Sequence, residues 1–149
     1  MTKAIYFDMD GTIADLYAVE GWLPMLEAHN ATPYTQAKTM VDMRVLARLL
    51  NKAQAKGVVI GVVSWLAKGS NEQYDIEVTN AKRKWLATHL KSVRWDEVHI
   101  VPYGTPKHNI VGCPNGVLFD DEVQNRNMWT GTAYDVQDIV GIIKALLCE

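Results

Sequence analysis

Several features that define other protein classes are scarce in this chain. It has 2 cysteines in 149 residues, Cys113 and Cys148, without CxxC spacing. This excludes a disulfide framework and predicts free thiols in a reducing compartment. No apolar run is long enough to span a bilayer, and no charged-then-apolar leader is present. The net charge of -2 and the pI near 6.1 leave no basic excess for a nucleic-acid backbone. We therefore expect a soluble, cytoplasmic protein with no membrane partner, and the charge disfavours a nucleic-acid partner.

The chain does have a regular series of short apolar runs. With 149 residues, 48% of them hydrophobic, it can bury one core but is too short for two full domains, so we expect one domain over residues 1–149. Runs rich in β-branched residues are typical of parallel strands that are buried on both faces. We expect the strands at residues 4–7, 58–63, 97–101, 116–119 and 132–134.

Helical patterns separate several of these runs. Apolar residues recur at three- and four-residue steps over 41–55, 80–90 and 136–147. Gly57 follows the first of these helices as a C-terminal cap, and Asp135 is expected to cap the last. The alternation predicts an α/β fold, a Rossmann-like parallel sheet flanked by helices.

Two irregular segments and one basic helix face complete this outline. Residues 13–44 interrupt the alternation after the first strand, and we expect a small, mostly helical, cap-like insertion over the carboxyl edge of the sheet. Residues 70–75 are expected to form a flexible polar loop. The remaining expectation is that a basic cluster forms the solvated face of the 80–90 helix: Lys82, Arg83, Lys84 and Lys91.

The segment Asp8-Met9-Asp10-Gly11-Thr12, at the end of the first apolar run, is the most informative part of the chain. In open α/β sheets, ligands bind outside the carboxyl ends of the strands, which is where this segment falls. Two carboxylates in one small volume repel each other unless a cation lies between them, and Mg²⁺ suits oxygen donors. An acidic turn would have the same composition, so the segment has to be weighed with the other strand ends.

Polar residues also follow the other strands. Ser64 ends the second strand, a loop at 102–106 leads from the third strand to Lys107, and Asp120-Asp121 end the fourth. Because the carboxyl ends of parallel strands share one edge, these side chains are expected to meet Asp8 and Asp10.

In this order the residues resemble the haloacid dehalogenase-like superfamily, whose usual members are Mg²⁺-dependent phosphohydrolases. Its first motif matches residues 6–12, its second matches Val62-Val63-Ser64, and its fourth matches Leu118-Phe119-Asp120-Asp121. Its third motif is a loosely placed lysine. Lys107 is the best candidate for it, and Lys68 and Lys82 compete.

The resemblance implies a phosphatase that forms an aspartyl-phosphate. Asp8 would attack phosphorus, and Asp10 would protonate the leaving oxygen and then deprotonate the attacking water. Ser64 and Lys107 would hold the phosphoryl group, and the same role is expected of Gly11 and Thr12.

The resemblance also implies a metal site. Mg²⁺ would be held by Asp8, the backbone carbonyl of Asp10, and Asp120. Asp121 would lie behind these ligands and orient a metal-bound water or Lys107.

A small phosphorylated substrate is expected, because a short cap covers only part of a site. Residues 7–16, together with Asp120-Asp121 and the following Asn125, resemble the 5'(3')-deoxyribonucleotidases of this superfamily. Those enzymes stack a base on cap aromatics, so a (deoxy)nucleoside monophosphate is one substrate and another small organic phosphate is the alternative. The aromatic residues of the insertion would either stack on that base or anchor the insertion to the domain body: Tyr17, Trp22 and Tyr34.

Two other functions remain open at this point. A phosphatase acting on nucleic-acid ends or phosphoprotein is favoured by the small cap and opposed by the acidic balance. A catalytically silent binding module of the same fold is opposed by the presence of both Asp8 and Asp10. The sequence does not specify an oligomeric state.

Overall fold

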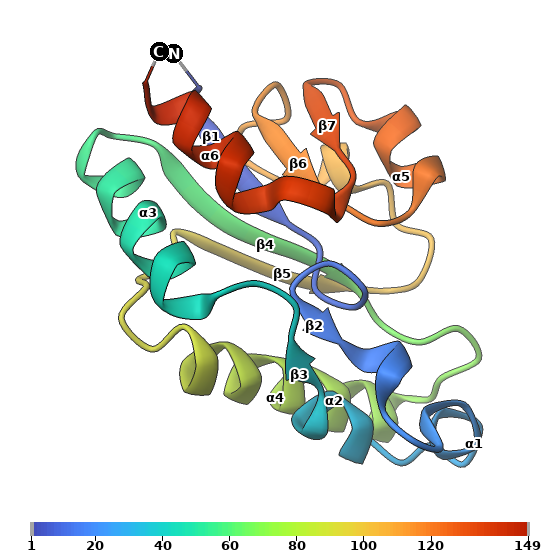
Figure 1. Ribbon diagram of the computed structural model, residues 1–149. Coiled ribbons are helices and arrows are strands. Elements are labelled where there is room, and N and C mark those ends of the chain that lie inside the picture. Colours follow the sequence, from blue (N-terminus) through green and yellow to red (C-terminus); the bar gives the residue numbers. More distant parts are fainter. Residues whose placement is uncertain (1, 149) are drawn as a thin grey trace.

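A computed structural model, which describes residues 2–148, contains a five-stranded sheet in the order β5-β4-β1-β6-β7 (Figure 1). Every neighbouring pair in this sheet is parallel. The fold class expected from the sequence is confirmed, and the strand positions agree closely with the apolar runs. The strands are β1 (Ala4–Phe7), β4 (Val59–Trp65), β5 (Glu97–Val101), β6 (Val117–Phe119) and β7 (Thr132–Tyr134).

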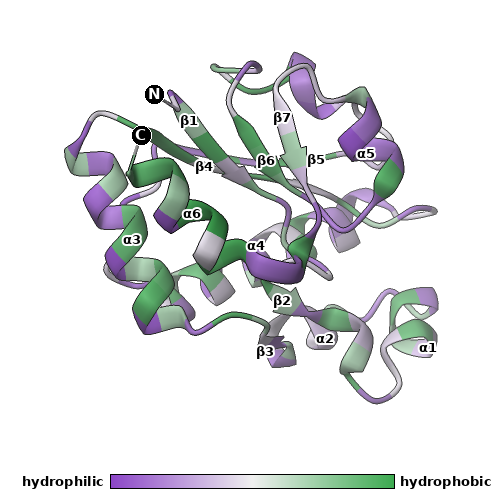
Figure 2. Ribbon diagram, turned by 45° about the horizontal axis from the view of Figure 1, so that its top comes forward, coloured by the Kyte–Doolittle hydropathy of each residue, from purple (hydrophilic) through white to green (hydrophobic). Residues whose placement is uncertain are grey.

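The main core lies on one face of the sheet. It is covered by α3 (Met43–Ala55), by α6 (Ile139–Leu147) and by the second half of α4 (Glu72–His89). Alternate strand residues such as Ile5 and Phe7 point into this core. Figure 2 shows α3 with a hydrophobic side toward α6 and a hydrophilic side outward, whereas α6 is hydrophobic over most of its length. The opposite face carries a smaller cluster, in which Tyr6 packs against Trp129 after α5 (Val123–Met128).

The helix expected at 80–90 begins much earlier. Residues 72–75, expected to be a flexible loop, form the first turn of α4, so that expectation is wrong. Asn71 caps the helix, because its side chain accepts a hydrogen bond from the backbone N–H of Tyr74. Tyr74 and Val78 are buried beside Ala81, and this contact extends the apolar face toward the N-terminus.

Two other helices differ from the sequence expectation. The helix expected over 136–147 starts as a short 3₁₀ turn at Val136–Asp138, and Asp138 then caps α6. Asp135 caps the 3₁₀ turn. Helix α5 was not predicted, because its sequence is polar and shows no apolar periodicity.

The segment between β1 and α3 contains short helices and one small hairpin. Its elements are β2 (Ala14–Asp15), α1 (Trp22–Glu27), α2 (Thr32–Gln36) and β3 (Lys38–Thr39), with β2 and β3 antiparallel. Leu16 and Tyr34 of this segment pack on α4. His29 also joins it to the loop before α4: its Nε2 lies 3.1 Å from the carbonyl of Gly69 and its ring stacks on Tyr74 at 4.9 Å.

A polar network crosses the sheet on the face that carries the smaller hydrophobic cluster. The ring of Tyr6 passes over Gly61, where a Cβ would lie 2.6 Å from the ring, and its hydroxyl donates to Glu97 at 2.7 Å. Glu97 also contacts His99 at 2.8 Å and accepts a hydrogen bond from the N–H of Gly112 at 2.9 Å. Burial opposes ionisation of Glu97, but the hydrogen bonds from Tyr6, His99 and Gly112 outweigh it and lower its pKa.

Within residues 2–148, no helix combines the length and apolarity that crossing a membrane requires.

Candidate functional site

The turn after β1 places two aspartates at the carboxyl edge of the sheet. The N–H of Asp8 donates to the carbonyl of Phe119 at 2.9 Å, so the first motif is bonded to the end of β6. Gly11 has a φ of +79°, and an added Cβ would collide with Asp121 and with the ring of Tyr17. Glycine is therefore required here, both for the left-handed conformation and for the close approach of Asp121.

Lys107 joins the first and fourth motifs. Lys107 begins a short 3₁₀ helix, Lys107–Asn109, after β5, and its side chain is 3% exposed. Its Nζ donates to Asp8 Oδ1 at 2.9 Å and to Asp120 Oδ2 at 2.7 Å. Burial alone would lower the pKa of Lys107, but the two carboxylates outweigh it and raise the pKa, so the group stays an ammonium.

The two adjacent aspartates at the end of β6 have different surroundings. Asp120 is fully buried, and both of its carboxylate oxygens have donors, from Lys107, the side chain of Asn125 and the N–H of Glu122. The carboxylate of Asp121 lies on the cavity side beside Asp8. Its role behind the metal remains a prediction, but these contacts favour Asp121 as a direct ligand and Asp120 as the partner of Lys107.

Thr12 is fully buried, and its hydroxyl donates to Asp8 Oδ2 at 3.0 Å. The Thr12 hydroxyl oxygen in turn accepts the backbone N–H of Asp121 at 3.3 Å. The phosphate contact of Thr12 stays a prediction, and this placement favours a role in orienting Asp8.

A second buried lysine lies beside Asp10. Lys82, in the middle of α4, is 1% exposed, and its Nζ lies 2.9 Å from Asp10 Oδ2 and 2.7 Å from Ser64 Oγ. The expectation that Lys82 belongs to a solvated basic face is therefore wrong, although Arg83, Lys84 and Lys91 are exposed. The signal was its spacing: position 82 falls on the helix face of Val78 and Trp85, which are both buried.

The carboxylates of the site are crowded. Burial raises the pKa of Asp120 to about 6 and that of Asp121 to about 8, and the charge of Asp8 adds to both shifts. Burial also raises the pKa of Asp10, against the pull of Lys82, and Asp8 contributes to the rise. A raised pKa suits a carboxyl group that has to carry a proton.

The residues present fit a divalent cation. One oxygen from each of Asp8, Asp120 and Asp121 lies within 4.8 Å of the other two. When all four site aspartates are ionised, the ammonium groups of Lys82 and Lys107 balance two of the four negative charges and leave two. A small hard cation with oxygen ligands, such as Mg²⁺, would supply that balance.

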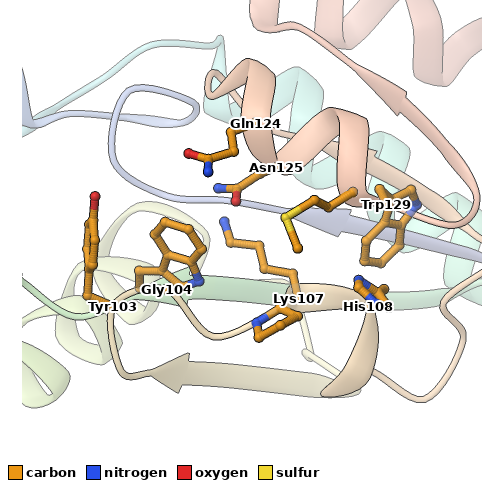
Figure 3. Close-up of a pocket in the computed structure, with 10 residues that line it drawn as sticks. Tyr103, Gly104, Lys107, His108, Gln124, Asn125 and Trp129 are labelled. Carbon is orange, nitrogen blue, oxygen red and sulfur yellow. The ribbon is translucent and has the colours of Figure 1, made fainter.

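A cavity of about 310 Å³ opens onto these groups. Asp8, Asp10 and Asp121 line its base, and aromatic rings form much of its walls. A side chamber of about 170 Å³ adjoins it and shares Lys107. Figure 3 shows the side chain of Lys107 rising toward Asn125. The aromatic lining comes from the segment 13–44, from the end of β4 and from the loop after β5: Tyr17, Trp22, Tyr34, Trp65 and Tyr103.

The three lysines that were candidates for the third motif therefore have different positions and contacts. Lys107 bonds the first and fourth motifs, Lys82 bonds Asp10 and Ser64, and Lys68 is exposed at the cavity wall, 6.0 Å from the ring of Tyr103. The structure brings all the predicted site residues to one edge of the sheet.

Comparison with solved structures finds the D,D-heptose 1,7-bisphosphate phosphatase from Burkholderia thailandensis, which aligns over 99% of this chain and 99% of that chain. The TM-score is 0.57 and the sequence identity is 10%. The fold is haloacid dehalogenase-like. At this identity the likeness shows the fold alone. No family model matches the chain, and no curated protein matches it. The haloacid dehalogenase-like fold accounts for the meeting of the four strand ends.

Proposed function

We propose that this chain is a Mg²⁺-dependent phosphatase that hydrolyses phosphate monoesters through an aspartyl-phosphate on Asp8. The observation that carries the proposal is the contact of Lys107 with both Asp8 and Asp120 at the base of an open cavity, with Asp10 beside it. An ion pair with a purely structural role needs no access to the surface, whereas Asp8, Asp10 and Lys107 line a space that a phosphate can enter.

In the first step, an oxygen of Asp8 forms a bond to phosphorus as the bond from phosphorus to the leaving oxygen breaks. The proton of the Asp10 carboxyl group goes to that leaving oxygen. In the second step, a water oxygen attacks phosphorus, its proton returns to Asp10, and the bond to Asp8 breaks to release inorganic phosphate. Such acid–base work contributes about 10²–10⁴-fold.

The remaining residues would bind the phosphoryl group, hold Asp8 in place or bind the metal ion. Ser64 and Lys107 would bind phosphoryl oxygens, and Thr12 would hold Asp8 in place through its hydroxyl. Mg²⁺, held by Asp8, the backbone carbonyl of Asp10 and one or both of Asp120 and Asp121, would neutralise the anionic substrate.

We also propose that the segment 13–44 acts as a small cap of a single-domain enzyme and that the substrate is a small phosphorylated compound. A (deoxy)nucleoside monophosphate is supported by the size of the cavity, about 310 Å³, and by its aromatic walls.

Release of phosphate from a panel of phosphorylated metabolites, with Mg²⁺ or with EDTA, tests the proposal. We expect Mg²⁺-dependent release by the wild-type protein and none by Asp8→Asn. Absence of release from every compound, or equal release by the variant, would contradict it.

A further inference from the structure

Lys82 is a buried cation that the proposed chemistry does not use. Its Nζ has three close oxygens: Asp10 Oδ2 at 2.9 Å, Ser64 Oγ at 2.7 Å and the carbonyl of Trp65 at 2.7 Å. An ammonium group has three N–H donors and no acceptor, so these contacts use every hydrogen. No N–H is left for a substrate, and Lys82 can act only through its neighbours.

The contact between Lys82 and Ser64 fixes which of the two groups donates the hydrogen bond. Since Lys82 only donates, Ser64 Oγ must accept, and the serine hydroxyl keeps its own proton for another acceptor. Ser64 is 1% exposed and follows the buried Val63 in β4, so its backbone is fixed as well. Ser64 itself does not line the cavity, but the next residue, Trp65, does, so an anion bound there is the acceptor that this arrangement favours.

The contact with Asp10 selects one oxygen. The ammonium holds Oδ2, which leaves Oδ1 to carry the proton of the leaving group. The ring of Tyr34 lies 5.3 Å from the same Nζ and is 5% exposed, so a residue of the insertion also shields this ammonium from water.

We propose that Lys82 is a positioning residue that directs the Asp10 proton toward the leaving oxygen and the Ser64 hydroxyl toward the phosphoryl group. The inference rests on the proposed phosphatase function. It assigns a different task to each of two buried lysines: Lys107 neutralises charge next to the nucleophile, and Lys82 orients the acid.

A leaving-group experiment tests this role. p-Nitrophenyl phosphate and phenyl phosphate have similar shapes, but nitrophenolate leaves readily without a proton, whereas phenolate depends on one. Lys82→Met should lower kcat/KM for phenyl phosphate about tenfold more than for p-nitrophenyl phosphate, within the range of acid catalysis. Lys84→Met, on the same helix but exposed, is the matched control and should leave both values unchanged.

A double variant separates positioning from general damage. If Lys82 acts through Asp10, then adding Lys82→Met to Asp10→Asn should not widen the gap between the two esters further. Affinity for inorganic phosphate in the presence of Mg²⁺, measured by calorimetry, gives a second readout. Lys82→Met and Ser64→Ala should each weaken it, with less than additive losses in the double variant.

The outcomes are distinct. If Lys82→Met lowers kcat/KM equally for both esters, or if the phosphate losses are additive, Lys82 has only a structural role and the inference is overturned while the proposed function stands. If Lys82→Met does not fold, Lys82→Arg keeps the charge but cannot repeat the three contacts, and the same gap between the esters is expected from it. If the wild-type protein hydrolyses neither these esters nor the metabolite panel, the proposed function fails and the inference fails with it.

Discussion

Replacement of Lys107 by methionine probes the centre of the site. The variant keeps a side chain of similar length but leaves Asp8 and Asp120 as neighbouring buried carboxylates without their shared ammonium group. Removal of one partner from a buried ion pair costs about 3–5 kcal/mol. For a chain of this size, about 2–4 °C per kcal/mol gives a fall in Tm of roughly 10 °C in metal-free buffer.

The size of the loss should depend on the metal and the pH. Mg²⁺ binding beside Asp8 would restore part of the stability, because it supplies positive charge to the same oxygens. Acid should also reduce the difference from wild type, since protonation removes the repulsion. Urea unfolding followed by circular dichroism, in EDTA and in MgCl₂, measures both effects, with Lys84→Met as the exposed control. A variant that unfolds within about 1 kcal/mol of wild type in EDTA would refute this reasoning.

Three further predictions follow from single residues. Asp8→Asn should abolish phosphate release and leave the circular dichroism spectrum unchanged; residual turnover above about 1% would place the nucleophile elsewhere. Gly11→Ala should lower stability by about 1–3 kcal/mol in urea titrations, because alanine is strained at a φ of +79° and its Cβ would meet Tyr17; unchanged stability would show that the turn relaxes. The lowered pKa of Glu97 contributes stability that is complete above its unfolded pKa and is lost as the pH falls through the folded value. Glu97→Gln should therefore flatten the acid limb of the stability curve between pH 7 and pH 3, and an unaltered limb would contradict the Tyr6–Glu97 network.

The sheet could be predicted from the sequence because each strand is a short apolar run that ends in a polar residue. The run at residues 4–7 and the run before Asp120 became β1 and β6, and the parallel arrangement then required their ends to meet. The position of Lys107 after β5 followed from the same argument.

The errors have a common physical cause. Lys82 was placed outside because a lysine costs free energy to bury, and only the three-dimensional meeting of α4 with Asp10 and Ser64 supplies the oxygens that offset this cost. Helix α5 lacks an apolar stripe, and it is held in place instead by hydrogen bonds such as that from Asn125 to Asp120. Contacts of this kind are non-local, so periodicity along the chain can place position 82 on a buried helix face but does not reveal the oxygens that Lys82 meets there.

The attachment of the segment 13–44 has a consequence for how compounds enter and leave. His29 lies against the loop before α4, and Leu16 and Tyr34 pack into the apolar cluster on that helix. A rigid-body opening of the segment 13–44 would have to break these contacts in every catalytic cycle. We therefore expect the segment 13–44 to stay in place beside the cavity, so that selection among substrates would depend on the shape of the opening and not on a closing movement.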